Sequence, residues 1–250
     1  MIIFTDVDLI FKRDIQDLYK IEIKNALGAC QDLVWCAFCD TPGRKDLEYA
    51  QKELELKNPY KYFNTGVMLL NLEYFRQYNI SQKLLEMANE KMYRILEQDI
   101  LNKFFKENIT YIEDCWNFPT MNPIYKQLMK NIKDLSIQKR YDTTRDNPAI
   151  IHWAGRGKAW NNPQEDLAYK WWEYARRTPF YETILLRIYT NPARELPNQI
   201  KHAFNYKKNC LTYWRYKFLY AISFGKTKEH YRTKKTLWKE KIKIGKILKK

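Results

Sequence analysis

Two carboxylates near the start of the chain, Asp6 and Asp8, are spaced so that they can bind one metal ion together. Residues two apart in an extended segment point to the same side, and carboxylate oxygens are ligands that Mg²⁺ and Mn²⁺ prefer. The pair follows an apolar run, residues 2–4, that predicts a buried parallel strand, and open α/β sheets bind ligands at the carboxyl ends of such strands. An Asp-x-Asp pair by itself is more often a turn or capping pair.

Three further segments supply polar groups of the kinds that a metal and phosphate site needs. Residues 63–66 (FNTG) place an amide beside a glycine, and residues 97–99 (EQD) stand at the start of an expected helix. Residues 152–160 (HWAGRGKAW) follow an apolar run and contain one imidazole, two glycines and two cations. Together with the Asp-x-Asp pair, these segments predict a metal site, an anion site and groups that recognise hydroxyls.

The chemistry of these segments suits a diphosphate ligand. His152 by itself would more often be a satisfied core or surface histidine, but its place at a strand end before Gly155 and Lys158 favours a metal ligand. Two carboxylates and a neutral imidazole bind a divalent cation and leave positions for phosphate oxygens. Glycines let backbone N–H groups approach those oxygens, and a lysine adds a mobile charge. A diphosphate leaving group is stabilised by such an arrangement.

In this order, the four segments resemble glycosyltransferase family 8, the metal-dependent retaining enzymes of GT-A type that include bacterial lipooligosaccharide galactosyl- and glucosyltransferases. The resemblance runs from about Ile2 to Trp160, with looser similarity at residues 171–181. It implies an α/β fold, the GT-A (Rossmann-like) nucleotide-diphospho-sugar transferase fold. It also implies Mn²⁺ or Mg²⁺ as the cofactor and a UDP-sugar as the donor.

The resemblance implies a role for each residue of the expected metal and diphosphate site. Asp6 and Asp8 match the Asp-x-Asp that holds the metal, with Asp6 also contacting the nucleotide, and His152 matches the third metal ligand. Gly155 and Lys158 match positions that contact the diphosphate.

The resemblance also implies roles on the sugar side of the site. Asn64 and Glu97 match residues that bind the donor sugar. Gln98 matches the glutamine beside the reacting carbon, and Asp99 completes the same triplet, so these two are the expected catalytic residues. As an amide, Gln98 is a poor nucleophile and is expected to stabilise the transition state. Asp99 has an equal alternative as a carboxylate that stabilises the helix start.

The chain departs from the family pattern in three places. Glu97 stands where the family usually has aspartate, and Ala159 replaces a proline, which should loosen that loop. Only five residues precede Asp6, where the family has most of a nucleotide-binding βα unit. We therefore expect an N-terminally truncated fold whose opening strand has a neighbour on one side only.

The elements that must position these residues alternate between strands and helices. Strands are expected at residues 62–72, 109–112 and 149–153, and helices at about 80–92 and 97–106. Apolar and aromatic residues at helical spacing over residues 166–189 predict a core-facing helical stripe. Short strands separated by helices are typical of an α/β layer architecture.

Charge is concentrated in the last fifty residues, which hold 16 Lys and Arg and only two acidic residues. Aromatic and apolar residues recur there at helical spacing, for example in residues 211–225, which predicts helices that lie on an anionic membrane surface. A solvated tail is the second alternative, and nucleic-acid binding is the least favoured. We therefore divide the chain into a catalytic domain, 1–198, and a membrane-associating tail, 199–250.

Other features concern the compartment. The five cysteines form no paired framework and suit a reducing environment, with Cys36 and Cys39 as ordinary buried thiols. The N-terminus lacks the pattern of a signal peptide, and no apolar stretch of about 18 residues suggests a membrane span.

Two hypotheses for the function follow. The first is a metal-dependent retaining glycosyltransferase that moves galactose or glucose from a UDP-sugar to a lipid-linked oligosaccharide in lipopolysaccharide or lipooligosaccharide synthesis. It would be cytoplasmic and peripherally attached to a bacterial inner membrane. The alternative is a catalytically inactive, membrane-associated fragment that acts as a binding or partner-packing module.

Overall fold

The computed structural model describes residues 1–155, 157–190, 229–232, 234, 235 and 239. The chain divides into two compact units, Met1–Tyr181 and Glu182–Lys250. The expected domain boundary at residues 198 and 199 lies outside the described residues, as does most of the basic tail, so both stay predictions.

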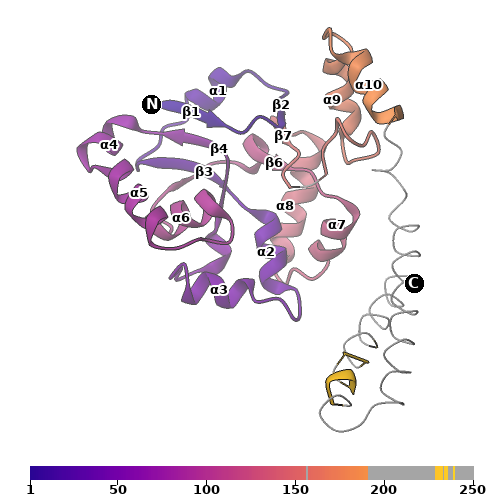
Figure 1. The fold of residues 1–250 in the computed structure, drawn as a ribbon. Coiled ribbons are helices and arrows are strands. Elements are labelled where there is room, and N and C mark those ends of the chain that lie inside the picture. The colour runs from indigo at the N-terminus through magenta and orange to yellow at the C-terminus, as the bar shows by residue number, and fades with distance from the viewer. Residues whose placement is uncertain (156, 191–228, 233, 236–238, 240–250) are drawn as a thin grey trace. The chain divides into compact units, whose positions relative to one another are not determined.

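The first unit is built on two small mixed sheets (Figure 1). In the first sheet β4 runs antiparallel to both β1 and β3, and β3 runs parallel to β5. Its strands, in spatial order, are β1 (Ile2–Thr5), β4 (Phe63–Leu70), β3 (Leu27–Gln31) and β5 (Thr110–Tyr111). In the second sheet β7 runs antiparallel to β2 and parallel to β6. Its strands are β2 (Leu9–Phe11), β7 (Ile150–His152) and β6 (Phe118–Pro119).

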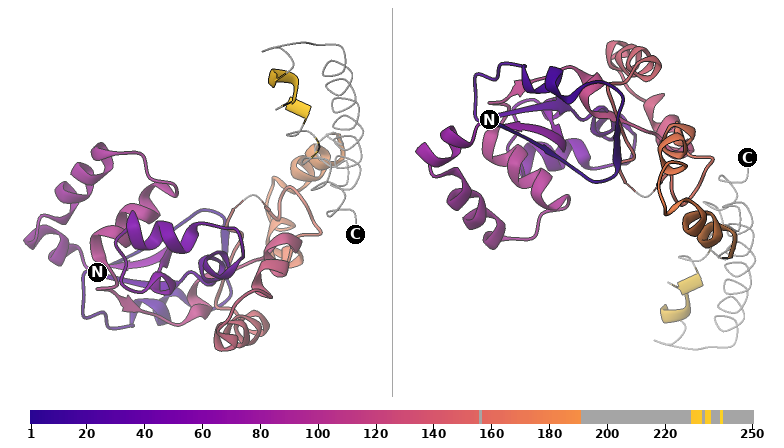
Figure 2. Two further views of the ribbon diagram at one scale, coloured as in Figure 1. Left: turned by 90° about the horizontal axis from the view of Figure 1, so that it is seen from below. Right: turned by 90° about the horizontal axis from the view of Figure 1, so that it is seen from above.

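The helices of the first unit lie around these sheets, with α4 and α5 at its outer side (Figures 1 and 2). They are α1 (Ile15–Tyr19), α2 (Leu33–Asp40), α3 (Asp46–Lys52), α4 (Leu72–Gln77), α5 (Ile80–Glu90), α6 (Leu96–Phe105), α7 (Pro123–Met129), α8 (Leu135–Asp146) and α9 (Ala168–Ala175). Two 3-10 turns are η1 (Pro59–Lys61) and η2 (Asp114–Asn117). One further helix, α10 (Tyr181–Thr190), begins at the boundary between the units. No helix in the described ranges is long and apolar enough to cross a bilayer.

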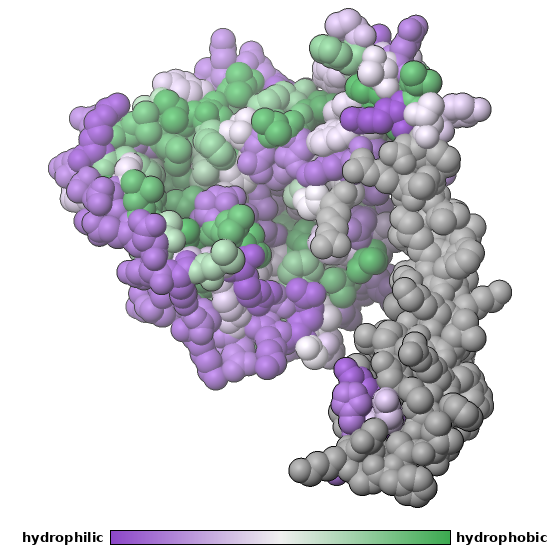
Figure 3. Space-filling view, viewed as in Figure 1, coloured by the Kyte–Doolittle hydropathy of each residue, from purple (hydrophilic) through white to green (hydrophobic). Residues whose placement is uncertain are grey.

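The opening strand differs from the expected buried parallel strand. It pairs antiparallel with β4, with Ile2 opposite Leu70, and it is an edge strand. Ile2 and Phe4 are 41% and 43% exposed. Figure 3 shows a hydrophobic area over the region of β1 and β4. The prediction that the opening strand has a neighbouring strand on one side only is confirmed. The prediction that it is buried is wrong, because this edge strand leaves the side chains of Ile2 and Phe4 exposed.

Other expectations are confirmed in part. The strands expected near residues 62–72, 109–112 and 149–153 correspond to β4, β5 and β7, and the two expected helices to α5 and α6. The helical stripe over residues 166–189 is core only in α9, since α10 has no buried residue. Cys36 and Cys39 are buried free thiols as predicted, and burial raises the pKa of Cys39 to about 12.

One buried cluster joins the two sheets. Val67 and Leu69 of β4 pack together with Ile150 of β7, and Trp116 of η2 belongs to the same cluster. The turn between β1 and β2 is therefore anchored to a shared core at both of its ends, because its flanking strands pair with β4 and β7.

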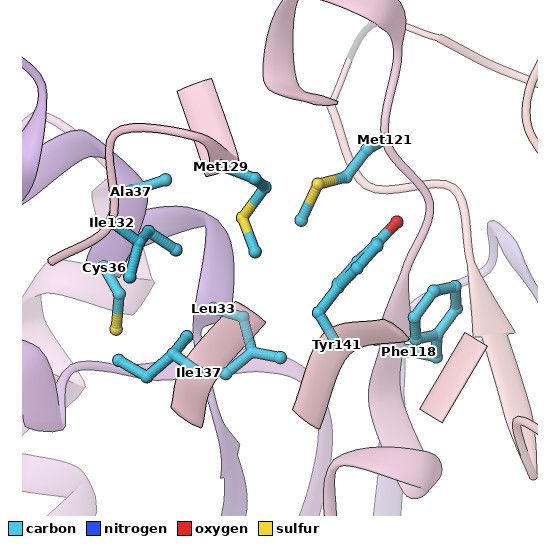
Figure 4. Close-up of a cluster of buried hydrophobic side chains, with 9 residues drawn as sticks. All are labelled: Leu33, Cys36, Ala37, Phe118, Met121, Met129, Ile132, Ile137 and Tyr141. Atoms are coloured by element: carbon cyan, nitrogen blue, oxygen red, sulfur yellow. The ribbon is translucent and has the colours of Figure 1, made fainter. Parts of the chain in front are cut away.

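A second cluster packs α2, α7 and α8 together and contains a buried tyrosine (Figure 4). Tyr141 lies 4.9 Å from Phe118 between ring centroids, and its hydroxyl has no hydrogen-bond partner among the described residues. Burial raises the pKa of Tyr141, so the hydroxyl stays protonated. Tyr62, in contrast, donates its hydroxyl proton to Asp99 Oδ1 at 2.6 Å.

These two tyrosines predict opposite effects of removing one oxygen. Tyr141→Phe should leave the free energy of unfolding unchanged or raise it by up to about 1 kcal/mol, because an unpaired buried hydroxyl is removed. Tyr62→Phe should lower it by about 1–3 kcal/mol, because a bond to a carboxylate is lost. Urea denaturation measures both. A loss in Tyr141→Phe as large as that in Tyr62→Phe would show that the Tyr141 hydroxyl is hydrogen-bonded.

Candidate functional site

The site begins at the turn between β1 and β2, which holds Asp6 and Asp8. The Asp6 backbone N–H donates to the Gly66 carbonyl at 2.9 Å, and the Trp153 N–H donates to the Asp8 carbonyl at 3.0 Å. The turn is therefore fixed to β4 on one side and to the end of β7 on the other. Because Leu9 pairs with His152 in the β2–β7 ladder, the imidazole arrives beside the two carboxylates.

The three predicted metal ligands converge. One ligand atom each from Asp6, Asp8 and His152 lies within 4.8 Å of the others. His152 Nε2 is 3.2 Å from Asp8 Oδ1 and 3.6 Å from Asp6 Oδ2. Two carboxylates and an imidazole are a donor set for Mn²⁺ or Mg²⁺. The residues present therefore fit a divalent cation.

The electrostatics of the cluster also favour a cation. Burial raises the pKa of Asp6, and the charges of Asp8 and Glu97 raise it further, against an opposing effect of His152. Burial also acts to raise the pKa of Asp8, but hydrogen bonds from His152 and Lys158 outweigh it and hold this pKa far below its usual value. Like charges thus gather around Asp6, and a metal ion would relieve their repulsion.

Lys158 already places a positive charge in the cluster. Its ammonium group contacts Asp8 Oδ2 and donates to the Trp153 carbonyl at 2.7 Å. The predicted diphosphate-contacting lysine and the predicted metal ligands therefore share one location. An ammonium group against Asp8 shows that this carboxylate accepts a cation partner.

A glycine gives the imidazole its space. A Cβ atom on Gly66 would lie 2.2 Å from His152 Cε1 and 2.6 Å from Nδ1. The sequence suggested that this glycine admits a ligand, but the structure shows that the His152 ring occupies the place. Gly66 is needed because any side chain would push the metal ligand aside.

The loop after β7 is held at several points. Gly155 has a φ of +80°, which favours glycine, and a Cβ on Gly157 would lie 2.8 Å from the Glu165 carboxylate. Ala159 is buried, and its carbonyl accepts a hydrogen bond from Trp172 Nε1 at 3.1 Å. The loosening expected from the absence of proline at this position stays a prediction.

On the sugar side, Asn64 and Gln98 lie in one hydrogen-bonded group with Asp32. Asn64 Nδ2 and Gln98 Nε2 both donate to Asp32 Oδ2, at 3.1 Å and 3.2 Å. Gln98 Oε1 accepts from the Thr65 backbone N–H at 3.1 Å. The predicted transition-state stabiliser is therefore buried and bonded to the protein at both ends of its amide. Glu97, next to it, is exposed at the start of α6.

Asp99 lies apart from the metal ligands. It has no exposed surface and accepts hydrogen bonds from the Tyr62 hydroxyl at 2.6 Å, the Tyr49 hydroxyl at 2.7 Å and the Ile95 N–H at 2.8 Å. This environment agrees with the alternative of a carboxylate at the helix start. A catalytic role for Asp99 stays a prediction.

Two residues of the site were missed in the sequence. Asp32 caps α2 through the Trp35 N–H at 2.9 Å, and Asn117 contacts both Asn64 and His152. Asp32 directly follows β3 (LGACQ), which lacks the β-branched and aromatic residues that predict strands. Had β3 been recognised, a carboxylate at its carboxyl end would have been a candidate. Asn117 carried no comparable signal.

The chain is similar to proteins of a known family. Residues 1–164 match the family model described as glycosyl transferase family 8. General stress protein A of Bacillus subtilis is 29% identical over 183 residues, which cover 70% of this chain and 59% of that protein. Lipopolysaccharide 1,2-glucosyltransferase of Escherichia coli is 24% identical over 167 residues, covering 64% of this chain and 44% of that protein. The chain thus spans about half the length of these relatives.

Solved structures show the same fold. The bifunctional glycosyltransferase WbbM, in its apo form, superposes with a TM-score of 0.70 at 28% identity, over 74% of this chain and 34% of that one. An active-site mutant of LgtC gives a TM-score of 0.52 at 26% identity, over 70% of this chain and 60% of that one. The fold is therefore the α/β, GT-A type expected from the sequence. Since the family model covers well over half of the residues, the chain belongs to glycosyl transferase family 8.

Proposed function

We propose that the chain supplies the metal and donor site of a retaining transferase that moves galactose or glucose from a UDP-sugar to a saccharide acceptor. The observation that carries this proposal is the convergence of Asp6, Asp8 and His152 within 4.8 Å, with Lys158 against Asp8. Such a group of residues is suited to a diphosphate held by a cation. The neighbouring amides of Asn64 and Gln98 suit the hydroxyls and the reacting centre of a sugar.

Each residue would contribute in a defined way. Asp6, Asp8 and His152 would hold Mn²⁺ or Mg²⁺, which when bound would stabilise the charge that develops on the departing diphosphate. Lys158, on a loop with Gly155, would move from Asp8 to the diphosphate oxygens. Gln98 would present its amide dipole to the reacting carbon from a fixed position, since the protein holds both ends of that amide.

For the acceptor and the location we propose a lipid-linked oligosaccharide at an anionic membrane surface, on the cytoplasmic face of a bacterial inner membrane. Two features support this proposal. The last fifty residues hold 16 Lys and Arg together with interfacial aromatic residues. A relative of this chain is named lipopolysaccharide 1,2-glucosyltransferase. Sedimentation with anionic vesicles, compared with RNA binding, tests the role assigned to the tail.

The second candidate is a binding or partner-packing module without turnover. The exposed apolar edge strand β1, with Ile2 and Phe4, favours it, because such edges pair with other chains. The two candidates differ in whether this chain releases UDP from UDP-galactose or UDP-glucose.

The metal site predicts a specific effect of Asp8→Asn. The substitution should lower Mn²⁺ affinity by at least about tenfold, because a carboxylate ligand and its negative charge are lost. Electron paramagnetic resonance of free Mn²⁺ measures the affinity. Mn²⁺-dependent UDP release should fall with it. Glu173→Gln is the control, since Glu173 is exposed and pairs only with nearby Lys170 in the part that the structure describes. Equal Mn²⁺ affinity in both variants would contradict the assigned site.

Lys158→Met should have opposite effects on two ligands. Mn²⁺ affinity should rise up to about fivefold, because a cation that competes for Asp8 is removed. Affinity for UDP in the presence of Mn²⁺ should fall, because a charge for the diphosphate is lost. Calorimetric titrations measure both values, with Lys170→Met as the control. If both affinities fall together, Lys158 has a structural role instead.

A further inference from the structure

A continuous line of hydrogen bonds joins the metal ligand to the sugar side of the site. His152 Nδ1 is 2.8 Å from Asn117 Oδ1, and Asn117 Nδ2 donates to Asn64 Oδ1 at 2.8 Å. Asn64 Nδ2 donates to Asp32 Oδ2 at 3.1 Å, and Gln98 Nε2 donates to the same oxygen at 3.2 Å. We call these five residues the amide chain. His152 lies in β7, and the other four residues come from four separate elements that precede it in the sequence.

The donor and acceptor roles along the amide chain are fixed by two groups, one that can only accept a hydrogen bond and one that can only donate. The Asp32 carboxylate can only accept, so Asn64 must turn its NH₂ group toward it. The Gly66 backbone N–H can only donate, and it reaches Asn64 Oδ1 at 2.9 Å, which fixes the other end of the same amide. Asn117 must then give its NH₂ group to Asn64 and turn its oxygen to His152.

The direction of these hydrogen bonds determines which ring nitrogen of His152 carries the hydrogen. An oxygen of Asn117 faces Nδ1, so Nδ1 carries a hydrogen, and the lone pair of a neutral ring is on Nε2, the atom that faces Asp6 and Asp8. A metal ligand needs that lone pair. Without Asn117, the carboxylate of Asp8 at 3.2 Å from Nε2 would favour a hydrogen on Nε2, the wrong tautomer for a metal.

We infer that Asn117 and Asp32 are positioning residues that make the metal ligand and the sugar-side amides one hydrogen-bonded unit. Asn117 sets the tautomer and ring orientation of His152, and Asp32 sets the orientation of Asn64 and Gln98. The inference rests on the proposed function, because it takes Asp6, Asp8 and His152 as the metal site. It adds two residues to the unit: Asn117, which contacts the expected ligand His152, and Asp32, which contacts Asn64 and Gln98.

Burial and backbone support give the amide chain its strength. His152, Asn117, Asp32 and Gln98 are buried and Asn64 is partly buried, so water competes weakly for these bonds. Asn117 ends η2, directly before the strand that pairs with β7, and Asp32 caps α2. Both positioning residues are therefore held by regular structure rather than by free loops.

The test reads the tautomer by NMR of the metal-free protein labelled with ¹⁵N-histidine. The chain has three histidines, and a His152→Gln variant assigns the signal of His152. Wild type should show a protonated, slowly exchanging Nδ1. Asn117→Asp keeps an acceptor for that hydrogen and should retain the signal, whereas Asn117→Ala should shift the neutral ring toward the Nε2–H tautomer.

Metal affinity gives a second measurement on the same variants. Asn117→Ala should lower Mn²⁺ affinity about 10–100-fold, as expected when the partner of a ligating histidine is lost, and Asn117→Asp should restore most of it. Asp32→Asn is a matched variant at the other end. It should leave the His152 tautomer unchanged, because Gly66 still fixes Asn64, and thermal unfolding confirms that each variant is folded.

The outcomes separate the inference from the proposed function. A wild-type tautomer and wild-type Mn²⁺ affinity in Asn117→Ala would overturn the inference, even where Asp8→Asn loses the metal. Mn²⁺ affinity that is unchanged in Asp8→Asn would overturn the metal site itself, while the tautomer of the metal-free protein still decides whether Asn117 positions His152. A tautomer change in Asn117→Ala that Asn117→Asp reverses supports the inference.

Discussion

The site depends on one short turn, between β1 and β2, that is held in place by both sheets. Asp6 is bonded through its backbone to β4 and Asp8 to the residue after β7, so the backbone that carries both carboxylates is fixed by strand pairing. The same two strands carry Gly66 and His152, whose close approach leaves no room for a Cβ atom. Backbone pairing therefore brings Asp6, Asp8 and His152 together, as a preorganised site requires.

The carboxylates that accept close partners are of two kinds, one enclosed and one partly open to solvent. Asp46 and Asp99 are buried with complete sets of donors, from Arg44 and Arg94 in the first case and from two tyrosines in the second. These groups stabilise the fold and have little left to offer a ligand. Asp6, in contrast, is half exposed, and burial together with the neighbouring carboxylates Asp8 and Glu97 raises its pKa, as is common for groups at functional sites.

Two buried polar side chains connect the parts of the site. Asn117 and Asp32 both contact residues with an expected role, and both are buried. Such partners determine which atom of a ligating histidine is available and which way an amide points. The orientation of His152, Asn64 and Gln98 therefore depends on these buried partners as well as on the elements that carry them.

The sequence alone determined the fold family and predicted the segments of the candidate site, because Asp6, Asp8, Asn64, Gln98 and His152 lie in short motifs whose residue types are tied to chemistry. Only the tertiary structure decided that β1 is an antiparallel edge strand, that Asp99 is enclosed by tyrosines and that Asp32 and Asn117 belong to the site. These features depend on contacts between residues far apart in the chain, so neither local periodicity nor spacing records them. The packing of both sheets on one shared core fixes which strands pair and which side chains meet at the site.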